Sequence, residues 1–313
     1  MSAATPLFAA RKSLLGQCLT AGLACSIIVR GDAGAPARAS PYHGDFETMK
    51  RLILAAMLAT GLAGAATTAL ADDALKSAIA GEQRSAANKA RDSYRHPYET
   101  LTFFGIRPTM TVIELAPGGG WYTEILAPYL RDKGKLVGAA PGPDTRYGKA
   151  FRERLAGDQA LYGKVTPAVF DPPSRYELGA PNSADMVVTF RNLHNWLGNG
   201  GDAAILTTFK EVHKVLKPGG VLGVVEHRLP TRMKQDEKAS SGYMHEAYVI
   251  RLAEQAGFKL AAKSEINANP KDTADHEKGV WTLPPVLANK DKDREKYLAI
   301  GESDRMTLKF VKQ

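Results

Sequence analysis

The segment from Thr111 to Leu126 constrains the fold more than any other part of this 313-residue sequence. It reads TVIELAPGGGWYTEIL: an apolar run, three consecutive glycines (Gly118 to Gly120), and then apolar residues at helical spacing. Because glycine has no Cβ, the backbone of such a turn can approach a ligand closely. The free N–H groups of the helix start then face that ligand. This order of strand, glycine turn and helix predicts a nucleotide-like binding site.

The first 71 residues are expected to lie outside the folded domain. A short basic start at residues 49–51 precedes an Ala/Leu-rich run, and Ala69-Leu70-Ala71 offers small residues at the positions that signal peptidase reads. A membrane-spanning helix over residues 52–71 is the alternative, which the many Ala, Gly and Thr residues disfavour. We therefore expect a signal peptide at 49–71, cleaved near Ala71, and a periplasmic or secreted bacterial protein with no membrane span after cleavage.

Residues 1–48 contain scattered Pro, Gly and Arg, and we interpret them as an upstream extension from an over-early start codon. The remaining 242 residues, 72–313, are enough for one domain with a substantial core. Removing residues 1–71 takes away six of 41 basic and three of 33 acidic residues and leaves a net charge of +5. The basic residues are scattered, which argues against nucleic acid as a partner. Both cysteines, Cys18 and Cys25, are removed too, which excludes disulfides and thiolate chemistry.

Strand-like and helix-like patterns alternate along residues 72–313. This alternation predicts an open, mostly parallel α/β sheet that binds ligands beyond the carboxyl ends of its strands. Residues 265–305 are polar and irregular, and are expected to form a solvated loop with a short helix near 293–300. The expected strands cover residues 111–115, 135–138, 164–170, 184–190, 221–225, 258–263 and 306–311, and the expected helices 146–155, 202–216 and 243–257.

Two details of the glycine turn indicate the kind of ligand. Glu114 lies inside the strand end, where its carboxylate would repel a pyrophosphate but attract an ammonium or a sulfonium. The Gly-x-Gly-x-x-Gly pattern of dinucleotide sites also fails, because Tyr122 and Thr123 occupy the region of the third glycine. Both observations disfavour a nicotinamide-dependent oxidoreductase.

Three motifs in this order resemble those of the class I S-adenosylmethionine-dependent methyltransferases. They are VIELAPGGGWYTEIL at the first strand, ADMVVTFRNLHNW at the fourth, and FKEVHKVLKPGGVLGVVEH at the fifth. More narrowly, Asp92, Arg95 and Pro97 with the NPKD segment (269–272) resemble an uncharacterised exported group of predicted methyltransferases. The resemblance implies a Rossmann-like, doubly wound, seven-stranded sheet, mostly parallel with an antiparallel last strand.

The resemblance also implies which residues contact S-adenosylmethionine. The methionine part would lie against the first motif, the adenine amino group against an acid after the third strand, and the sulfonium against the end of the fourth. An acid that grips the ribose hydroxyls is expected after the second strand, but Gly138-Ala-Ala-Pro141 stands there. The implied contacts are Glu114, Ala116, Gly118 and Gly120, then Asp171, then Phe190 and Arg191.

Polar residues that follow the fourth and fifth strands are candidates for chemistry. His194 and His227 could each act as a base or bind substrate, and Glu226 could orient either of them. His245 is a further candidate, and Arg95 and Tyr98 could close over the pocket from the N-terminal helix. The histidine spacing matches no short zinc motif, so no metal is expected.

These observations support two functions. The first is methyl transfer from S-adenosylmethionine to a small-molecule acceptor. The second is a binding protein that has lost catalysis, which the absent ribose-binding acid favours. The sequence does not identify the methyl acceptor or the oligomeric state.

Overall fold

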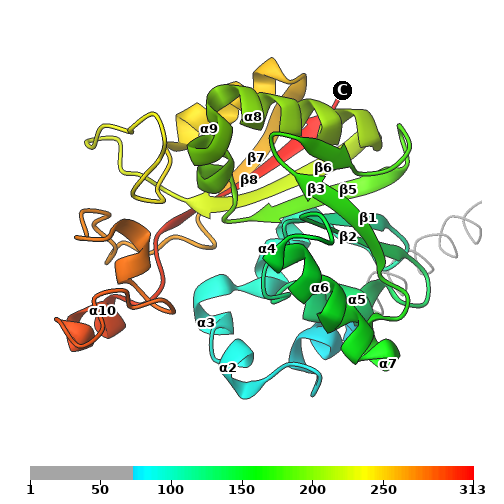
Figure 1. Ribbon diagram of the computed structural model, residues 1–313, viewed down its shortest axis with the longest axis horizontal. Helices are drawn as coiled ribbons and strands as arrows, with labels where there is room; N and C mark the ends of the chain where they lie inside the picture. Colours follow the sequence, from blue (N-terminus) through cyan, green and yellow to red (C-terminus); the bar gives the residue numbers. More distant parts are fainter. Residues whose placement is uncertain (1–72) are drawn as a thin grey trace, which may run out of the picture. The chain divides into compact units, whose positions relative to one another are not determined.

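The computed structural model describes residues 73–313, all of which belong to one compact unit (Figure 1). The expected upstream extension (1–48) and signal peptide (49–71) lie outside the described residues. Within the described part, no helix has both the length and the apolar character needed to cross a membrane.

The domain is built on one eight-stranded sheet with the order β4-β3-β2-β1-β5-β6-β8-β7. All pairings are parallel except those of β8 with β6 and β7 and of β4 with β3. The strands are β1 (Thr111–Leu115), β2 (Lys135–Ala140), β3 (Thr166–Asp171), β4 (Arg175–Glu177), β5 (Ala184–Phe190), β6 (Leu216–His227), β7 (Phe258–Ser264) and β8 (Arg305–Lys312).

This sheet confirms the expected α/β class and the antiparallel last strand, with one addition. Seven strands match the expected set in order, and β4 is an eighth that the sequence pattern did not predict. It forms because the turn at Asp171–Ser174, in which the Ser174 N–H donates to the Asp171 carbonyl at 2.9 Å, folds the chain back onto β3. Three residues give too short a run for alternation to be recognised.

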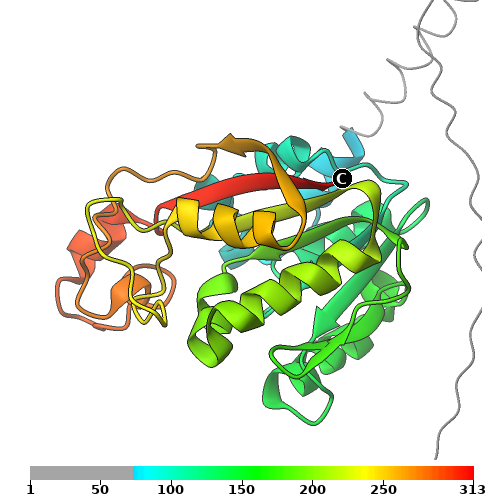
Figure 2. The same ribbon diagram turned by 90° about the horizontal axis from the view of Figure 1, so that it is seen from above.

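Helices cover both faces of the sheet, with α8 and α9 on one side and α5, α6 and α7 on the other (Figures 1 and 2). Successive side chains of a strand pack into hydrophobic cores on opposite faces of the sheet. Ile113 packs in the cluster that contains residues of α8 and α9, and Val112 packs in the cluster that contains residues of α5. Residues 73–80 are also helical. The remaining helices are α2 (Ala86–Lys89), α3 (Asp92–Arg95), α4 (Pro97–Phe104), α5 (Thr123–Leu130), α6 (Arg146–Gly157), α7 (Gln159–Tyr162), α8 (Leu193–Val215), α9 (Glu246–Gln255), η1 (Gly279–Thr282) and α10 (Arg294–Ile300).

The helix expected from Asp202 is present, but a helical segment that the sequence did not predict precedes it from Leu193. The two segments form α8, which is interrupted by non-helical φ and ψ angles at Gly200 and Gly201. One sequence-based expectation about local structure was wrong. Residues 265–305 are not a solvated loop, because Leu283 is fully buried and Asn267 and Ser303 are 2% exposed. This segment lies beyond the carboxyl end of β6 (Figure 1), and its Ser303 hydroxyl lies 2.6 Å from Nδ1 of His227.

Candidate functional site

The glycine turn presents bare backbone at the carboxyl end of β1. Gly118 and Gly120 have φ values of +58° and +79°, in the left-handed region that favours glycine. A Cβ added at Gly118 or Gly119 would meet no atom within 4 Å, so this part of the turn faces open space. Ala116, expected to share the cradle, also has a positive φ, of +45°. The backbone of the turn is therefore open to close approach, and the expected binding of a ligand there remains a prediction.

Glu114 lies directly beneath this turn and is 2% exposed. The Thr123 hydroxyl, from the first turn of α5, donates a hydrogen bond to its carboxylate at 2.7 Å. Burial raises the pKa of Glu114 to about 7, although the Thr123 hydrogen bond and the charge of Arg191 act in the opposite direction. A carboxyl group that titrates near neutral pH at a strand end is typical of a ligand-binding site.

The end of β5 contacts the glycine turn directly. Phe190 stacks on Tyr122, with ring centroids 3.5 Å apart. The Asn192 side-chain amide donates to the carbonyl groups of Leu115 at 3.1 Å and Ala116 at 3.4 Å. Asn192 was not predicted as a site residue, although it stands within the fourth-strand motif. It ties the two loops that would enclose a ligand between β1 and β5.

Glu226 is a fully buried carboxylate that organises the start of α8. It accepts hydrogen bonds from the Leu193 N–H at 2.6 Å and the His227 N–H at 2.8 Å. Its Oε1 atom also lies 3.0 Å from Nδ1 of His194, and within the described part of the chain no carboxylate contacts Nε2 of that ring. Such an imidazole–carboxylate pair fixes the ring orientation that a general base needs.

Of the two histidines that Glu226 could orient, the structure pairs it with His194, and His227 has another partner. Its Nδ1 lies 2.6 Å from the Ser303 hydroxyl, so Glu226 orients His194 and Ser303 orients His227. The two imidazole rings lie 5.3 Å apart. Burial, followed by the charges of His194 and Arg191, lowers the pKa of His227 well below its usual value. The structure thus brings the three predicted residues together with separate supporting contacts.

This group also has the composition of a metal site. One ligand atom from each of His194, Glu226 and His227 lies within 4.8 Å of the others. The nearby positive charges of Arg191, Arg305 and Arg95, which help to lower the pKa of His227, oppose a cation. The expectation that no metal binds here remains a prediction.

The other predicted residues lie outside the group formed by His194, Glu226 and His227. Asp171 ends β3 and is partly exposed, and its carbonyl closes the turn to β4. His245 caps α9, where its N–H donates to the Gln235 side chain at 2.6 Å, and it is not part of the histidine group. Arg95 is 3% exposed and lies over the Trp121 ring, 4.7 Å from its centroid. Tyr98 is partly buried, with Lys76 over its ring.

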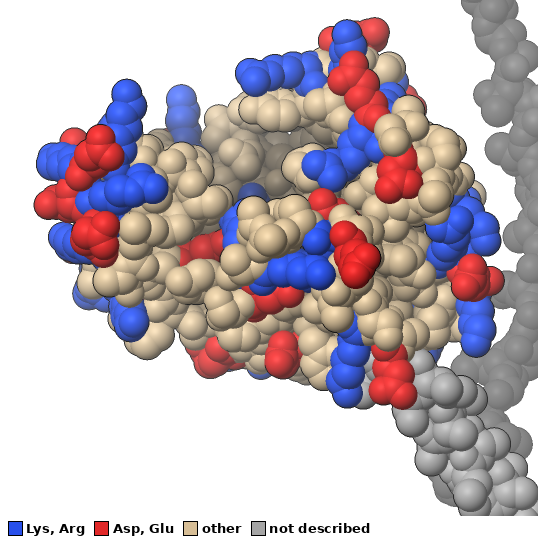
Figure 3. Space-filling view, turned by 90° about the horizontal axis from the view of Figure 1, so that it is seen from below, with Lys and Arg blue, Asp and Glu red and all other residues tan. Residues whose placement is uncertain are grey.

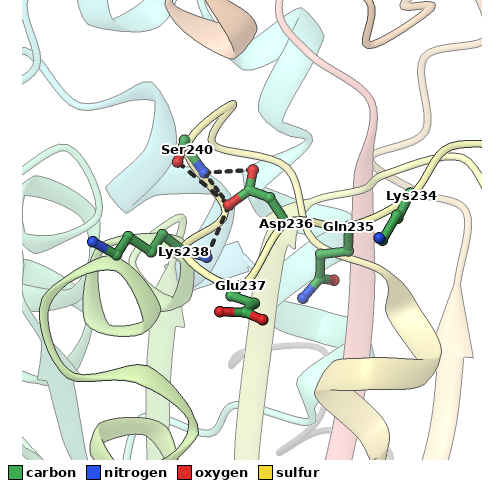
Figure 4. A pocket seen from close by; sticks show the side chains of 6 residues that line it. All are labelled: Lys234, Gln235, Asp236, Glu237, Lys238 and Ser240. Atoms are coloured by element: carbon green, nitrogen blue, oxygen red, sulfur yellow. Dashed lines mark hydrogen bonds between the residues drawn. The ribbon is translucent and has the colours of Figure 1, made fainter.

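A separate surface pocket lies in the loop after β6, where Asp236 accepts hydrogen bonds from the N–H groups of Lys238 and Ser240 at 2.8 and 2.9 Å (Figure 4). It contains none of the predicted site residues. It is lined by Lys234, Gln235, Asp236, Glu237, Lys238 and Ser240.

No family model and no curated protein sequence matches this chain. Its fold is similar to an S-adenosylmethionine-dependent methyltransferase from Aquifex aeolicus (20% identity, TM-score 0.44, 57% of this chain and 87% of that one). A second from Mesorhizobium loti is 12% identical (TM-score 0.43, 69% and 97% covered). A possible exported protein from Bordetella parapertussis is 17% identical (TM-score 0.44, 71% and 68% covered). At these values the similarities assign no function.

The low pKa of His227 predicts that acid destabilises the fold. In the unfolded chain this histidine takes up a proton near pH 6.5. Below that pH unfolding binds a proton, and the free energy of unfolding falls as the pH drops toward the lower folded-state pKa, by up to about 1.4 kcal/mol per pH unit. Denaturant unfolding at pH 5.5 and 7 is expected to show a smaller fall in a His227→Gln variant than in the wild type.

Glu114, with its raised pKa, contributes a pH dependence of opposite sign, but this contribution is common to both proteins and cancels in the comparison. An equal fall in the variant and the wild type would show that His227 is not the responsible group.

Proposed function

We propose that this protein binds S-adenosylmethionine between the carboxyl ends of β1 and β5 and transfers its methyl group to a small-molecule acceptor. The observation that carries this proposal is the open glycine turn at the centre of the strand order. The connections that leave β1 and β5 place α5 and α8 on opposite faces of the sheet. Ligands of open α/β sheets bind at such a switch point.

The residues at this point fit the methionine end of the ligand. The turn leaves room for close approach at Gly118, and Glu114 supplies a carboxyl group for an ammonium or a sulfonium. The ribose end lacks the expected acid. A Cβ at Gly138 would lie 2.5 Å from the Phe151 ring, so packing keeps that position without a side chain, and Asp144 is exposed. The affinity of the protein for S-adenosylmethionine would then depend on contacts with the methionine part of the ligand.

S-adenosylmethionine would supply an electrophilic methyl group, and the protein would position the acceptor in line with it. His194 would remove a proton from an acceptor that carries one at neutral pH, with Glu226 holding its ring in place. His227 would stay neutral beside it, held by Ser303. The proposal that the protein is exported rests on the sequence at residues 49–71.

Nucleic acid is not among the proposed partners. In Figure 3, basic and acidic side chains are interspersed over the face shown, so the basic residues form no continuous patch there.

The absent ribose-binding acid supports a second candidate, a binding protein on the same fold without catalysis. The test incubates the protein with a small-molecule extract and with S-adenosylmethionine that carries a labelled methyl group. It distinguishes an enzyme from a binding protein without catalysis. An enzyme would label an extract component and form S-adenosylhomocysteine, and the His194→Gln variant would do neither. His213→Gln, at the far end of the same helix, is the matched control. Binding without any transfer would favour the second candidate.

The raised pKa of Glu114 predicts pH-dependent binding of the cofactor product. Ionisation of Glu114 around pH 7 would add attraction for the ammonium group of S-adenosylhomocysteine. We expect the affinity to rise by up to about tenfold between pH 6 and pH 8 in calorimetric titrations. Glu114→Gln keeps the shape and can still bond to Thr123, and its affinity should be nearly constant over this range. A variant with the same pH profile as the wild type would exclude Glu114 as the source.

A further inference from the structure

Three arginines converge on a single buried carboxylate beside the candidate site. Glu302 is 4% exposed, and its carboxylate forms ion pairs with three guanidinium groups. The nitrogen–oxygen distances are 2.6 Å to Arg91, 3.1 Å to Arg95 and 3.2 Å to Arg305. Arg305 is 1% exposed and also donates to the Tyr94 carbonyl at 2.7 Å. Three positive groups therefore share one negative group in a region with little access to water.

Arg191 adds a fourth positive charge to this group. It follows β5 directly, with its N–H bonded to the Val225 carbonyl at 2.7 Å, and β8 places Arg305 opposite His227 on the neighbouring strand. Within residues 73–313, no hydrogen bond or ion pair engages the Arg191 side chain. Its backbone has a φ of +61°, in the left-handed region that is costly for a residue with a side chain. The chain thus holds an unpaired guanidinium at the carboxyl edge of the sheet.

Among residues 73–313, the other acids near this group compensate little of its charge: the buried Glu114, on which the charge of Arg191 acts, has its pKa raised to about 7. Asp92 pairs with Arg84 at 2.6 Å and Asp304 with Arg228 at 2.9 Å. Burial raises the pKa of Glu302, but the charges of Arg95, Arg305 and Arg91 outweigh it and hold this pKa at about 2. Burial and then the charge of Arg191 lower the pKa of Arg95 to about 8. Buried positive charge of this kind is costly unless an anion compensates it.

We propose that Arg191 and the Arg91–Arg95–Arg305 group bind an oxyanion, a carboxylate or a phosphate group carried by the methyl acceptor. Guanidinium groups match the geometry of both anions. His194 and His227 lie next to this position, so the acceptor would be held by its negative end with its reacting atom at the histidines. This assignment rests on the proposed function and names its acceptor class.

The first test measures anion binding without any cofactor. Isothermal titration and thermal shift with inorganic phosphate and with acetate, at low ionic strength, are expected to show saturable binding to the wild type. Arg191→Gln should weaken it at least tenfold, and Arg191→Lys less. Arg251→Gln, which removes an exposed arginine paired with Asp202, is the matched control and should bind like the wild type. Equal affinity in Arg191→Gln and the wild type, or no binding to either, would overturn the proposal.

The second test identifies the source of the anion, since S-adenosylhomocysteine also carries a carboxylate. Phosphate titrations are repeated with saturating S-adenosylhomocysteine and with 5′-methylthioadenosine, which lacks the amino-acid part. Unchanged phosphate affinity in both cases is the expected result. Competition by S-adenosylhomocysteine alone would assign the arginines to the cofactor and overturn the acceptor assignment. Phosphate binding without any S-adenosylhomocysteine binding would contradict the proposed function and remove the basis for calling the anion a methyl acceptor.

Discussion

Gly118→Leu is expected to abolish binding of S-adenosylhomocysteine while leaving the protein folded. The leucine side chain would enter the open space above the turn, where it meets no protein atom within 4 Å but occupies the volume that the ligand needs. We expect the affinity, measured by isothermal titration, to fall by more than about 100-fold, which corresponds to about 2.7 kcal/mol. The backbone at a φ of +58° adds a strain of roughly 1 kcal/mol.

Gly219→Leu is the matched control for this variant. Gly219 has a φ of +75°, its added Cβ would also meet nothing within 4 Å, and it lies in the turn near the amino end of β6, at the opposite edge of the sheet. It carries the same kind of strain without any effect on the proposed ligand. Retained affinity in Gly118→Leu, with both variants equally stable, would place the ligand elsewhere.

Glu226→Ala is expected to cost more stability than any surface substitution. Loss of this carboxylate leaves the Leu193 and His227 N–H groups and the His194 ring without their acceptor in a fully buried position. Breaking a buried charged network in this way costs about 3–5 kcal/mol. For a domain of this size the melting temperature should fall by roughly 10 °C, as measured by calorimetry.

Glu254→Ala removes an exposed glutamate from α9 and is the control, with an expected change within about 0.5 kcal/mol. Glu226→Gln, which keeps an acceptor oxygen, should lie between the two. A melting temperature for Glu226→Ala equal to that of the control would show that the carboxylate does not hold the start of α8.

The sequence was most informative where local pattern and tertiary role coincide. The apolar runs at 111–115 and 184–190 form β1 and β5 with these same bounds, because strands buried on both faces show continuous apolar sequence. The glycine turn was predictable for a similar reason, since the positive φ values of Gly118 and Gly120 favour glycine. His194, Glu226 and His227 were predictable as a group because parallel strands end at one edge of a sheet.

What the sequence did not reveal depends on contacts between distant segments. Helix α8 starts at Leu193 because Glu226, 33 residues away, accepts its first N–H. Ser303 and Glu302 stand in a polar stretch whose composition indicates solvent, yet both are buried by contacts with β6 and the N-terminal helices. The arginine group is likewise assembled from three parts of the chain, and no local spacing indicates it.

The most direct test of the proposed function is calorimetric titration of the purified protein with S-adenosylmethionine and with S-adenosylhomocysteine, paired with thermal shift. The proposal predicts saturable binding of one molecule per chain for both ligands, a raised melting temperature, and loss of both signals in Gly118→Leu. No heat and no thermal shift with either ligand would contradict it.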